Sequence, residues 1–303
     1  MSQPTIRKPL DGFAIFVMVF LCLCWGFQQV AVKAAAPSMN PVLQLGIRSL
    51  VGAILVFIFM LFKRDNLSLR DGTFWPGFWV GLLFGGEFLA VSVGLIFTTA
   101  SHMSVFLYTA PVFTAIGLHA FVSGEHLSFR QWLGVLVAFV GIVIAFSAGL
   151  LEESRSAEYT TLGDFLGVVS GALWASTTVL IRGTSLSNAS PGKTLLYQLV
   201  GAAVMLIPIA VISGQATNIQ FTPTLWLSLT FQSVAVGFLS FLVWFWLMTK
   251  YLASRLAVFS FLTPLIGVSL GVLLLGDPLD VRFVVGSILV LAGIFIVNRR
   301  TSD

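Results

Sequence analysis

The sequence contains few charged residues and no recognisable catalytic or metal-binding motif. Only 9% of its 303 residues are Asp, Glu, Lys or Arg, whereas 57% are hydrophobic, which excludes an ordinary soluble domain. The three histidines are scattered without the spacing of metal ligands, and no nucleotide-binding loop occurs. We therefore expect no metal, no cofactor and no use of nucleotide hydrolysis.

Cysteine is also scarce, because Cys22 and Cys24 are the only two. Side chains two residues apart on a helix diverge, so these thiols cannot easily form a disulfide. We expect both to be small packing residues. They indicate nothing about the redox compartment.

Ten long apolar runs make up most of the chain. They cover residues 12–32, 41–62, 74–98, 101–122, 129–148, 162–182, 192–213, 225–249, 252–275 and 281–298. A helix needs about 20 apolar residues to cross the hydrocarbon core of a bilayer, and the runs lack the alternating polarity of barrel strands. The sequence therefore predicts an all-α polytopic membrane protein with ten transmembrane helices.

The second half of the chain repeats the first. Trp25 and Lys33 return as Trp174 and Arg182, and "ASHMSVFLYTAPVF" returns as "ASRLAVFSFLTPLI". The segment "GEHLSFRQWLGVLVAFVGIVIAF" likewise matches the later "GDPLDVRFVVGSILVLAGIFIV". The predicted halves are residues 12–148 and 162–298, joined by a linker at 149–161. Five spans is an odd number, so the second half must be inverted relative to the first, as in inverted-repeat transporters with a site between their repeats.

The basic residues indicate the orientation in the membrane. The positions predicted on one side are Arg7, Lys8, Lys63, Arg64, Arg70, Arg130, Arg182, Lys193, Lys250, Arg255, Arg299 and Arg300, against Lys33, Arg155 and Arg282 on the other. The positive-inside rule then predicts that both termini are cytoplasmic. The net charge of +4 is thus a topology signal, and no nucleic-acid partner is expected.

These motifs resemble the drug/metabolite transporter superfamily. The "A-S-x-x-x-V-F…P" helix, the "G-[ED]-x-L-x-x-R…G" segment of each half and the Trp–basic spacing resemble its ten-helix EamA-type branch, over about residues 12–298. The pattern is also similar to the bacterial aromatic amino acid exporters of that branch. The resemblance implies amino-acid export. It departs from the small multidrug antiporters of the superfamily, since no acid lies between Gly12 and Val32 where they carry a glutamate.

Two charged residues lie deep inside predicted spans, away from the span ends. Glu87 is near the middle of the third span, where a buried carboxylate must be paired, protonated or functional. The alternatives are a structural ion pair or neutral acid, and a contact for a substrate ammonium or a coupled proton. Arg48, in the second span, could pair with Glu87, bind a substrate carboxylate with its planar fork or extend toward the surface. Neither has a charged counterpart, because the repeat aligns Glu87 with Ser240.

Two prolines and a set of aromatic and amide residues complete the candidate site. Pro111 and Pro264 occupy equivalent positions in the fourth and ninth spans, where proline frees a carbonyl and favours a kink; each is either a static kink or a hinge. Candidate cavity residues are Trp25, Gln28, Phe88, Tyr108, Trp174, Gln232, Ser240 and Trp244. Packing between helices would also explain the presence of each of these residues without any substrate contact. Lys33 and Arg182 are interpreted as cations that stabilise the ends of the first helix of each half. Glu125 and Asp277 precede the helix starts predicted near Ser128 and Asp280, where acids and small polar residues satisfy free amides.

These observations lead to one functional hypothesis. We expect a secondary transporter of the bacterial inner membrane that exports small metabolites, above all amino acids including aromatic ones, by alternating access, and that works as a monomer. Drugs or nucleotide sugars are the alternative substrates. A membrane enzyme should carry an acid, His or metal cluster in an interfacial loop, and a channel should carry long polar stripes; neither feature is present.

Overall fold

Most of the membrane-length helices begin at a polar side chain that accepts a hydrogen bond from the first turn. Asp11 accepts from Ala14 N at 3.0 Å, and Asn40 accepts from Val42 N at 2.9 Å. Ser128 forms a reciprocal capping box with Gln131. Such contacts satisfy amides that have no partner inside the helix. The predicted helix starts near Ser128 and Asp280 are confirmed.

The computed structural model describes residues 7–151, 157–275 and 280–299. Part of the predicted linker, residues 152–156, lies outside this range, as does Asp277. The helices of the first half are α1 (Gly12–Ala35), α2 (Pro41–Lys63), α3 (Phe74–Phe97), α4 (Ala100–Leu107), α5 (Ala110–Phe121), α6 (Phe129–Ala145) and α7 (Ser147–Leu151). Those of the second half are α8 (Ala157–Gly183), η1 (Ser185–Asn188), α9 (Pro191–Ile212), α10 (Pro223–Thr230), η2 (Phe231–Ser240), α11 (Phe241–Lys250), α12 (Ala253–Phe259), α13 (Leu262–Leu275) and α14 (Val281–Asn298).

The all-α polytopic fold is confirmed. Among the described residues, nine helical stretches of at least 18 residues are apolar enough to cross a membrane. The predicted fifth span corresponds to α6, which has 17 residues and is one short of that length. Together they account for the ten predicted spans.

Three spans are irregular rather than continuous. The fourth is interrupted between α4 and α5, just before Pro111, and the ninth between α12 and α13, just before Pro264. Both interruptions lie where proline predicts a kink; their role as hinges stays a prediction. The eighth span contains η2, a π-helical segment of ten residues, which the sequence did not predict.

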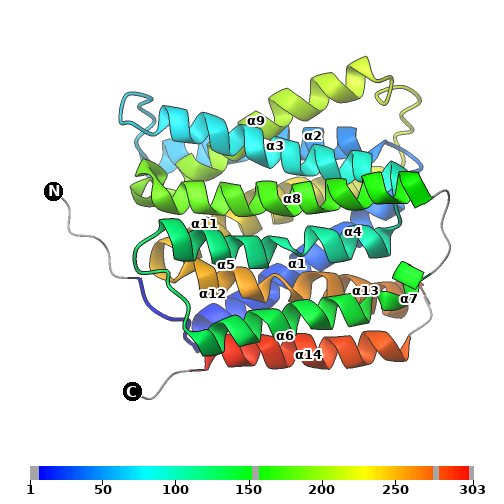
Figure 1. Cartoon of the computed structure of the whole chain (residues 1–303). Coiled ribbons are helices and arrows are strands. Elements are labelled where there is room, and N and C mark those ends of the chain that lie inside the picture. Colours follow the sequence, from blue (N-terminus) through cyan, green and yellow to red (C-terminus); the bar gives the residue numbers. More distant parts are fainter. Residues whose placement is uncertain (1–6, 152–156, 276–279, 300–303) are drawn as a thin grey trace.

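The two halves pack against each other along equivalent surfaces. Helix α3 contacts α8 and α9, and the corresponding α10–η2–α11 span contacts α1 and α2. Helices α6 and α14 lie side by side along one edge of the bundle (Figure 1). Glycines permit this packing: a Cβ on Gly201 of α9 would collide with the backbone of Gly81 on α3, as expected for small residues at helix interfaces in lipid.

The beginning of α1 and the end of α14 lie at the same end of the bundle, at the left of Figure 1. We call this the N/C end, and the opposite end, where α7 and the beginning of α8 lie, the linker end. At the N/C end Lys8 N donates to Lys250 O at 3.1 Å. Contacts here therefore join the segment before α1 to the second half.

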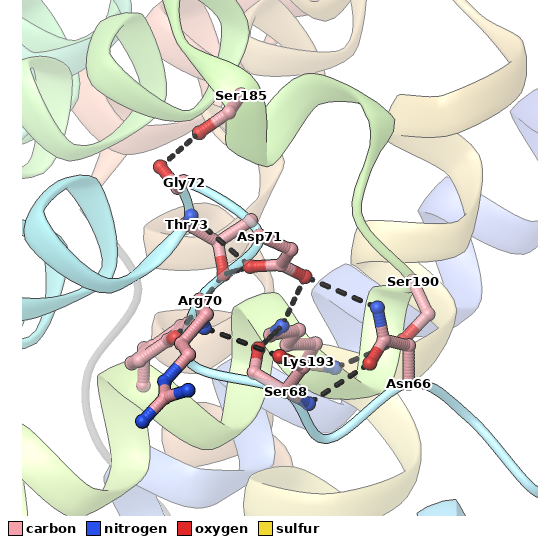
Figure 2. Close-up of polar contacts among 10 residues, drawn as sticks. Asn66, Ser68, Arg70, Asp71, Gly72, Thr73, Ser185, Ser190 and Lys193 are labelled. Atoms are coloured by element: carbon pink, nitrogen blue, oxygen red, sulfur yellow. Dashed lines mark hydrogen bonds and ion pairs between the residues drawn. The ribbon is translucent and has the colours of Figure 1, made fainter.

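The loop between α2 and α3 is also fixed to the second half at the N/C end. Lys193 at the start of α9 donates from Nζ to Ser68 O and to Asp71 Oδ2, both at 2.5 Å (Figure 2). Ser185 Oγ donates to Gly72 O at 2.8 Å (Figure 2). Because Lys193 is buried, its ammonium requires this partner.

Candidate functional site

A cavity of about 530 Å³ lies between the two halves of the bundle. Its volume is within the usual range for small-molecule sites. Seven of the ten predicted contact residues line it: Trp25, Gln28, Glu87, Phe88, Tyr108, Trp174 and Trp244. They come from α1, α3, α8, α11 and the segment between α4 and α5, so both halves contribute to the wall.

The cavity extends to the linker end of the bundle. Its lining there includes Asn40 and Pro41 at the start of α2, and Ser213 and Gln215 just beyond α9. On the side of the N/C end the lining includes Ile181, which is buried. The neighbouring residue, Arg182, belongs to a buried polar cluster.

A buried cluster centred on Glu125 lies between the cavity and the N/C end. The side chain of Glu125, in the loop after α5, is 1% exposed and forms an ion pair with Arg182 of α8, which is 3% exposed. Arg182 Nε donates to Glu125 Oε1 at 3.0 Å, and Nη2 donates to the same oxygen. The two carboxylate oxygens also accept from Ala253 N and Ser254 N at 3.0 Å each, and from Ser254 Oγ at 2.7 Å.

These contacts join three elements that are distant in sequence. Glu125 caps the N-terminus of α12, where free amides and the helix dipole favour an anion. The sequence interpretation placed Glu125 at the start of α6 and was wrong, because Ser128 and Gln131 perform that capping. Arg7 lies nearby and donates to Ser187 O at 2.9 Å. Burial lowers the pKa of Arg7 below its ordinary value, and the positive charge of Arg182 lowers it further.

Glu87 is the acid of the cavity wall. It lies on α3 and is 8% exposed, and the described residues include no Lys, Arg or His within 4.0 Å of its carboxylate. Arg48 is its electrostatic neighbour at longer range. Of the alternatives given for Arg48, a direct ion pair with Glu87 is therefore not formed, and the carboxylate remains available to a cavity ligand.

Arg48 is fully buried behind the cavity wall instead of lining it. Its guanidinium carbon lies 4.5 Å from the ring centre of Phe88 and 5.6 Å from that of Phe241. Its three guanidinium nitrogens have no hydrogen-bond partner among the described residues. A cation–π contact contributes about 2 kcal/mol in a desolvated site, whereas burial of an unpaired ion costs several kcal/mol. The ring contacts alone do not offset this cost.

Ser240 and Gln232 also lie outside the cavity lining. Ser240 Oγ accepts from the indole Nε1 of Trp25 at 3.0 Å and donates to Val236 O at 2.8 Å. Gln232 Nε2 donates to Gln44 Oε1 at 2.9 Å and to Ser228 Oγ at 2.8 Å. Ser240 thus holds a cavity residue in place, and Gln232 joins η2 to α2.

Aromatic rings form much of the remaining wall. Trp25 contacts Trp244 with ring centres 5.6 Å apart, and Tyr108 contacts Trp174 at 5.9 Å. The lining also includes residues that the sequence did not single out, among them Asn40, Thr177, Thr178, Gln198 and Thr263. No motif marks these positions, because a single polar residue in an apolar span has no distinctive spacing. The wall can accommodate an apolar ring and offers one carboxylate.

Comparison with known proteins identifies the family. A profile of the EamA-like transporter family matches residues 12–147 and again residues 161–299, which confirms the duplication. The chain belongs to the EamA-like transporter family. The branch predicted from the sequence is therefore correct, and the protein is a transporter with a duplicated helical unit.

Individual relatives of this EamA-like transporter span nearly its whole length. An uncharacterized transporter of Archaeoglobus fulgidus is 28% identical over 291 residues, which cover 94% of this chain and 96% of the relative. Proteins of Salmonella typhimurium and Escherichia coli, each named "probable amino-acid metabolite efflux pump", are 25% identical over 94% of both chains. A crystal structure with 17% identity has a TM-score of 0.81 over 97% of this chain and 100% of its own, which supports the fold alone.

Proposed function

We propose that this transporter exports amino acids, including aromatic ones, through the cavity. The observation that carries the proposal is Glu87: a carboxylate in a cavity wall that also contains several aromatic rings, with no described Lys, Arg or His within 4.0 Å of it. An ammonium group would provide its partner, and the rings would bury an apolar side chain. The two relatives named as amino-acid metabolite efflux pumps support this substrate class.

The proposed location is the bacterial inner membrane, with the N/C end in the cytoplasm. The basic residues that support this orientation include Arg7, Lys193 and Lys250. At the N/C end Arg7 donates to Ser187 O, Lys193 donates to Ser68 O, and Lys250 O accepts from Lys8 N. A cavity that extends to the linker end would then face the outside. One chain surrounds the cavity with helices from both halves, and we propose that it works as a monomer.

Alternating access requires the Glu125 cluster to open. In the proposed cycle, a substrate from the cytoplasm reaches the cavity only when Glu125 separates from Arg182 and from the start of α12. Bending at the interruptions before Pro111 and Pro264 would supply the movement. With no nucleotide-binding motif in the sequence, the substrate gradient or a coupled ion would supply the energy.

Nucleotide sugars are less suitable substrates. Their phosphates would need a cationic wall, and the lining contains Glu87 but no Lys or Arg among the described residues. A cationic drug remains compatible with Glu87, so transport assays must include one.

The test is transport of labelled phenylalanine into proteoliposomes, with and without a pH gradient. Amino acids, a cationic dye and a nucleotide sugar serve as competitors. We expect competition by amino acids, and we expect Glu87→Gln to reduce phenylalanine flux about 10- to 100-fold, as for a lost charge-assisted contact. Asp65→Asn, which removes a carboxylate from the α2–α3 loop, is the matched control. Unchanged flux in Glu87→Gln at every pH, or flux of the dye alone, would overturn the proposal.

A further inference from the structure

Arg48 is the largest fully buried side chain among the described residues. It projects from α2 toward η2, where its Cγ and backbone oxygen lie close to Gly237. Its guanidinium can donate five hydrogen bonds in a fixed plane, and Nε, Nη1 and Nη2 have no partner in the part of the chain that the structure describes. Native proteins seldom leave such a group unsatisfied.

The surroundings of Arg48 are those of a binding site. Gln44 lies one turn away on α2, and its partner Gln232 on η2 also has an unpartnered buried oxygen, Oε1. The π-helical segment η2 spans residues 231–240, and π-helical turns occur frequently at functional sites. A Cβ at position 237 would lie 3.4 Å from Cγ of Arg48, so Gly237 lets the backbone of η2 pack closely against the stem of this side chain.

Two aromatic residues of the cavity lining contact Arg48. Phe88 and Phe241 both line the cavity and both contact the guanidinium. Phe88 is also the residue after Glu87. Movement of both rings would therefore expose Arg48 to the cavity that Glu87 also lines.

From this geometry we infer that Arg48 is a carboxylate subsite, which a ligand reaches when the rings of Phe88 and Phe241 move aside. The inference rests on the proposed function and specifies its substrate class as zwitterions that carry an ammonium and a carboxylate. The ammonium is bound by Glu87 and the carboxylate by Arg48. A zwitterion supplies a partner for both charges, whereas an amine without a carboxylate leaves Arg48 unpaired.

The experiment compares three compounds that differ only in their charged groups. Phenylalanine has both groups, phenylethylamine lacks the carboxylate and 3-phenylpropionate lacks the ammonium. In proteoliposomes, Arg48→Gln is expected to raise the KM for phenylalanine about 10- to 100-fold and to leave inhibition by phenylethylamine unchanged. Arg48→Lys, which retains the charge without the planar fork, should give an intermediate KM. Arg282→Gln, which removes an exposed arginine, is the control.

The outcomes separate the subsite from other roles of Arg48. If Arg48→Gln weakens the binding of phenylalanine and of phenylethylamine equally, Arg48 acts only as a counter-charge and the inference is overturned. An unchanged KM for phenylalanine would also overturn it. If Arg48→Gln does not fold, Phe88→Leu tests the same point, because a smaller covering side chain should strengthen inhibition by 3-phenylpropionate and not by phenylethylamine.

Failure of the proposed function would be visible in the wild-type protein. If wild type does not transport phenylalanine, the amino-acid proposal fails, and the subsite is then tested by binding alone. The shift of the unfolding temperature with 3-phenylpropionate is measured for wild type and Arg48→Lys. A shift that is smaller in the variant supports a carboxylate subsite, and equal shifts or none would overturn it.

Discussion

The indole nitrogen of Trp25 donates to the hydroxyl of Ser240 over 3.0 Å, which joins α1 of the first half to the end of η2 in the second. Trp25 lines the cavity, and Ser240 is the residue that the repeat aligns with Glu87. The same position thus carries the cavity acid in one half and the support for a cavity ring in the other. The site is asymmetric although the scaffold is duplicated.

A double-mutant cycle measures this contact. Ser240→Ala and Trp25→Phe should each lower the free energy of unfolding by about 1 kcal/mol through the lost hydrogen bond, with an added packing loss for Trp25. The double variant should lose less than the sum. Thermal unfolding in detergent is the measurement. Ser269→Ala is the control, because Ser269 donates only to Leu265 O of its own helix. Strictly additive losses would mean that the hydrogen bond does not form.

The close packing of Gly171 against the interruption between α4 and α5 predicts that an added methyl group at this position is destabilising. Gly171 of α8 packs against it, and a Cβ there would lie 2.6 Å from Thr109 Oγ1 and 2.8 Å from Leu107 O. Gly171→Ala should therefore displace α8 from α4 and α5, and lower both the unfolding temperature and the transport rate. On the same helix, Gly183→Ala is a matched control, because its Cβ would meet only Val122 Cγ2 at 3.8 Å. Equal behaviour of the two variants would contradict this packing.

The fold was largely predictable because its signals are local. Span length follows from composition over about 20 residues, and inversion follows from an odd number of spans in each repeat. The kinks before Pro111 and Pro264 follow from the missing amide of proline. The π-helical η2 had no such signal: nothing in its composition distinguishes a π-helical turn from an α-helical one.

The site was predictable only in part, because the depth of a residue in the membrane does not determine where its side chain points. Glu87 was recognised from its position near the middle of a span. Arg48 was recognised in the same way, yet it points toward Gly237 and not into the cavity. When a helix is apolar on all sides, periodicity does not show which face meets the cavity. The Glu125–Arg182 pair joins residues 57 positions apart, a distance over which sequence spacing carries no signal.

The Glu125 cluster predicts a coupled change in stability and access. Glu125→Gln leaves Arg182 buried without its ionic partner, which should lower the free energy of unfolding by about 3 kcal/mol. It should also favour the conformation open at the N/C end. A cysteine at Ile181, in a background without Cys22 and Cys24, should then react faster with a membrane-impermeant thiol reagent from that side.

Arg130→Gln is the control for this experiment, since Arg130 is exposed at the same end of the bundle. Its effect on labelling and stability should be small. Faster labelling in Arg130→Gln as well would indicate a general charge effect. Unchanged labelling in Glu125→Gln would show that the cluster does not close the pathway.

The contact between Lys193 and Asp71 predicts a change of stability at acid pH. Hydrogen bonding to Lys193, with a further contribution from Thr73, lowers the pKa of Asp71 from 3.8 to about 2. Because the pKa of the folded state is the lower one, the stabilisation is fully present above pH 4 and disappears as the pH falls toward 2. Asp71→Asn should lower the unfolding temperature by about 2–4 °C at pH 6, and this difference from wild type should shrink between pH 4 and pH 2. Lys193→Met removes the other partner and should lose the same pH-dependent part of the stability. If the unfolding temperature of both variants differs from that of wild type by a constant amount between pH 4 and pH 2, the contact is contradicted.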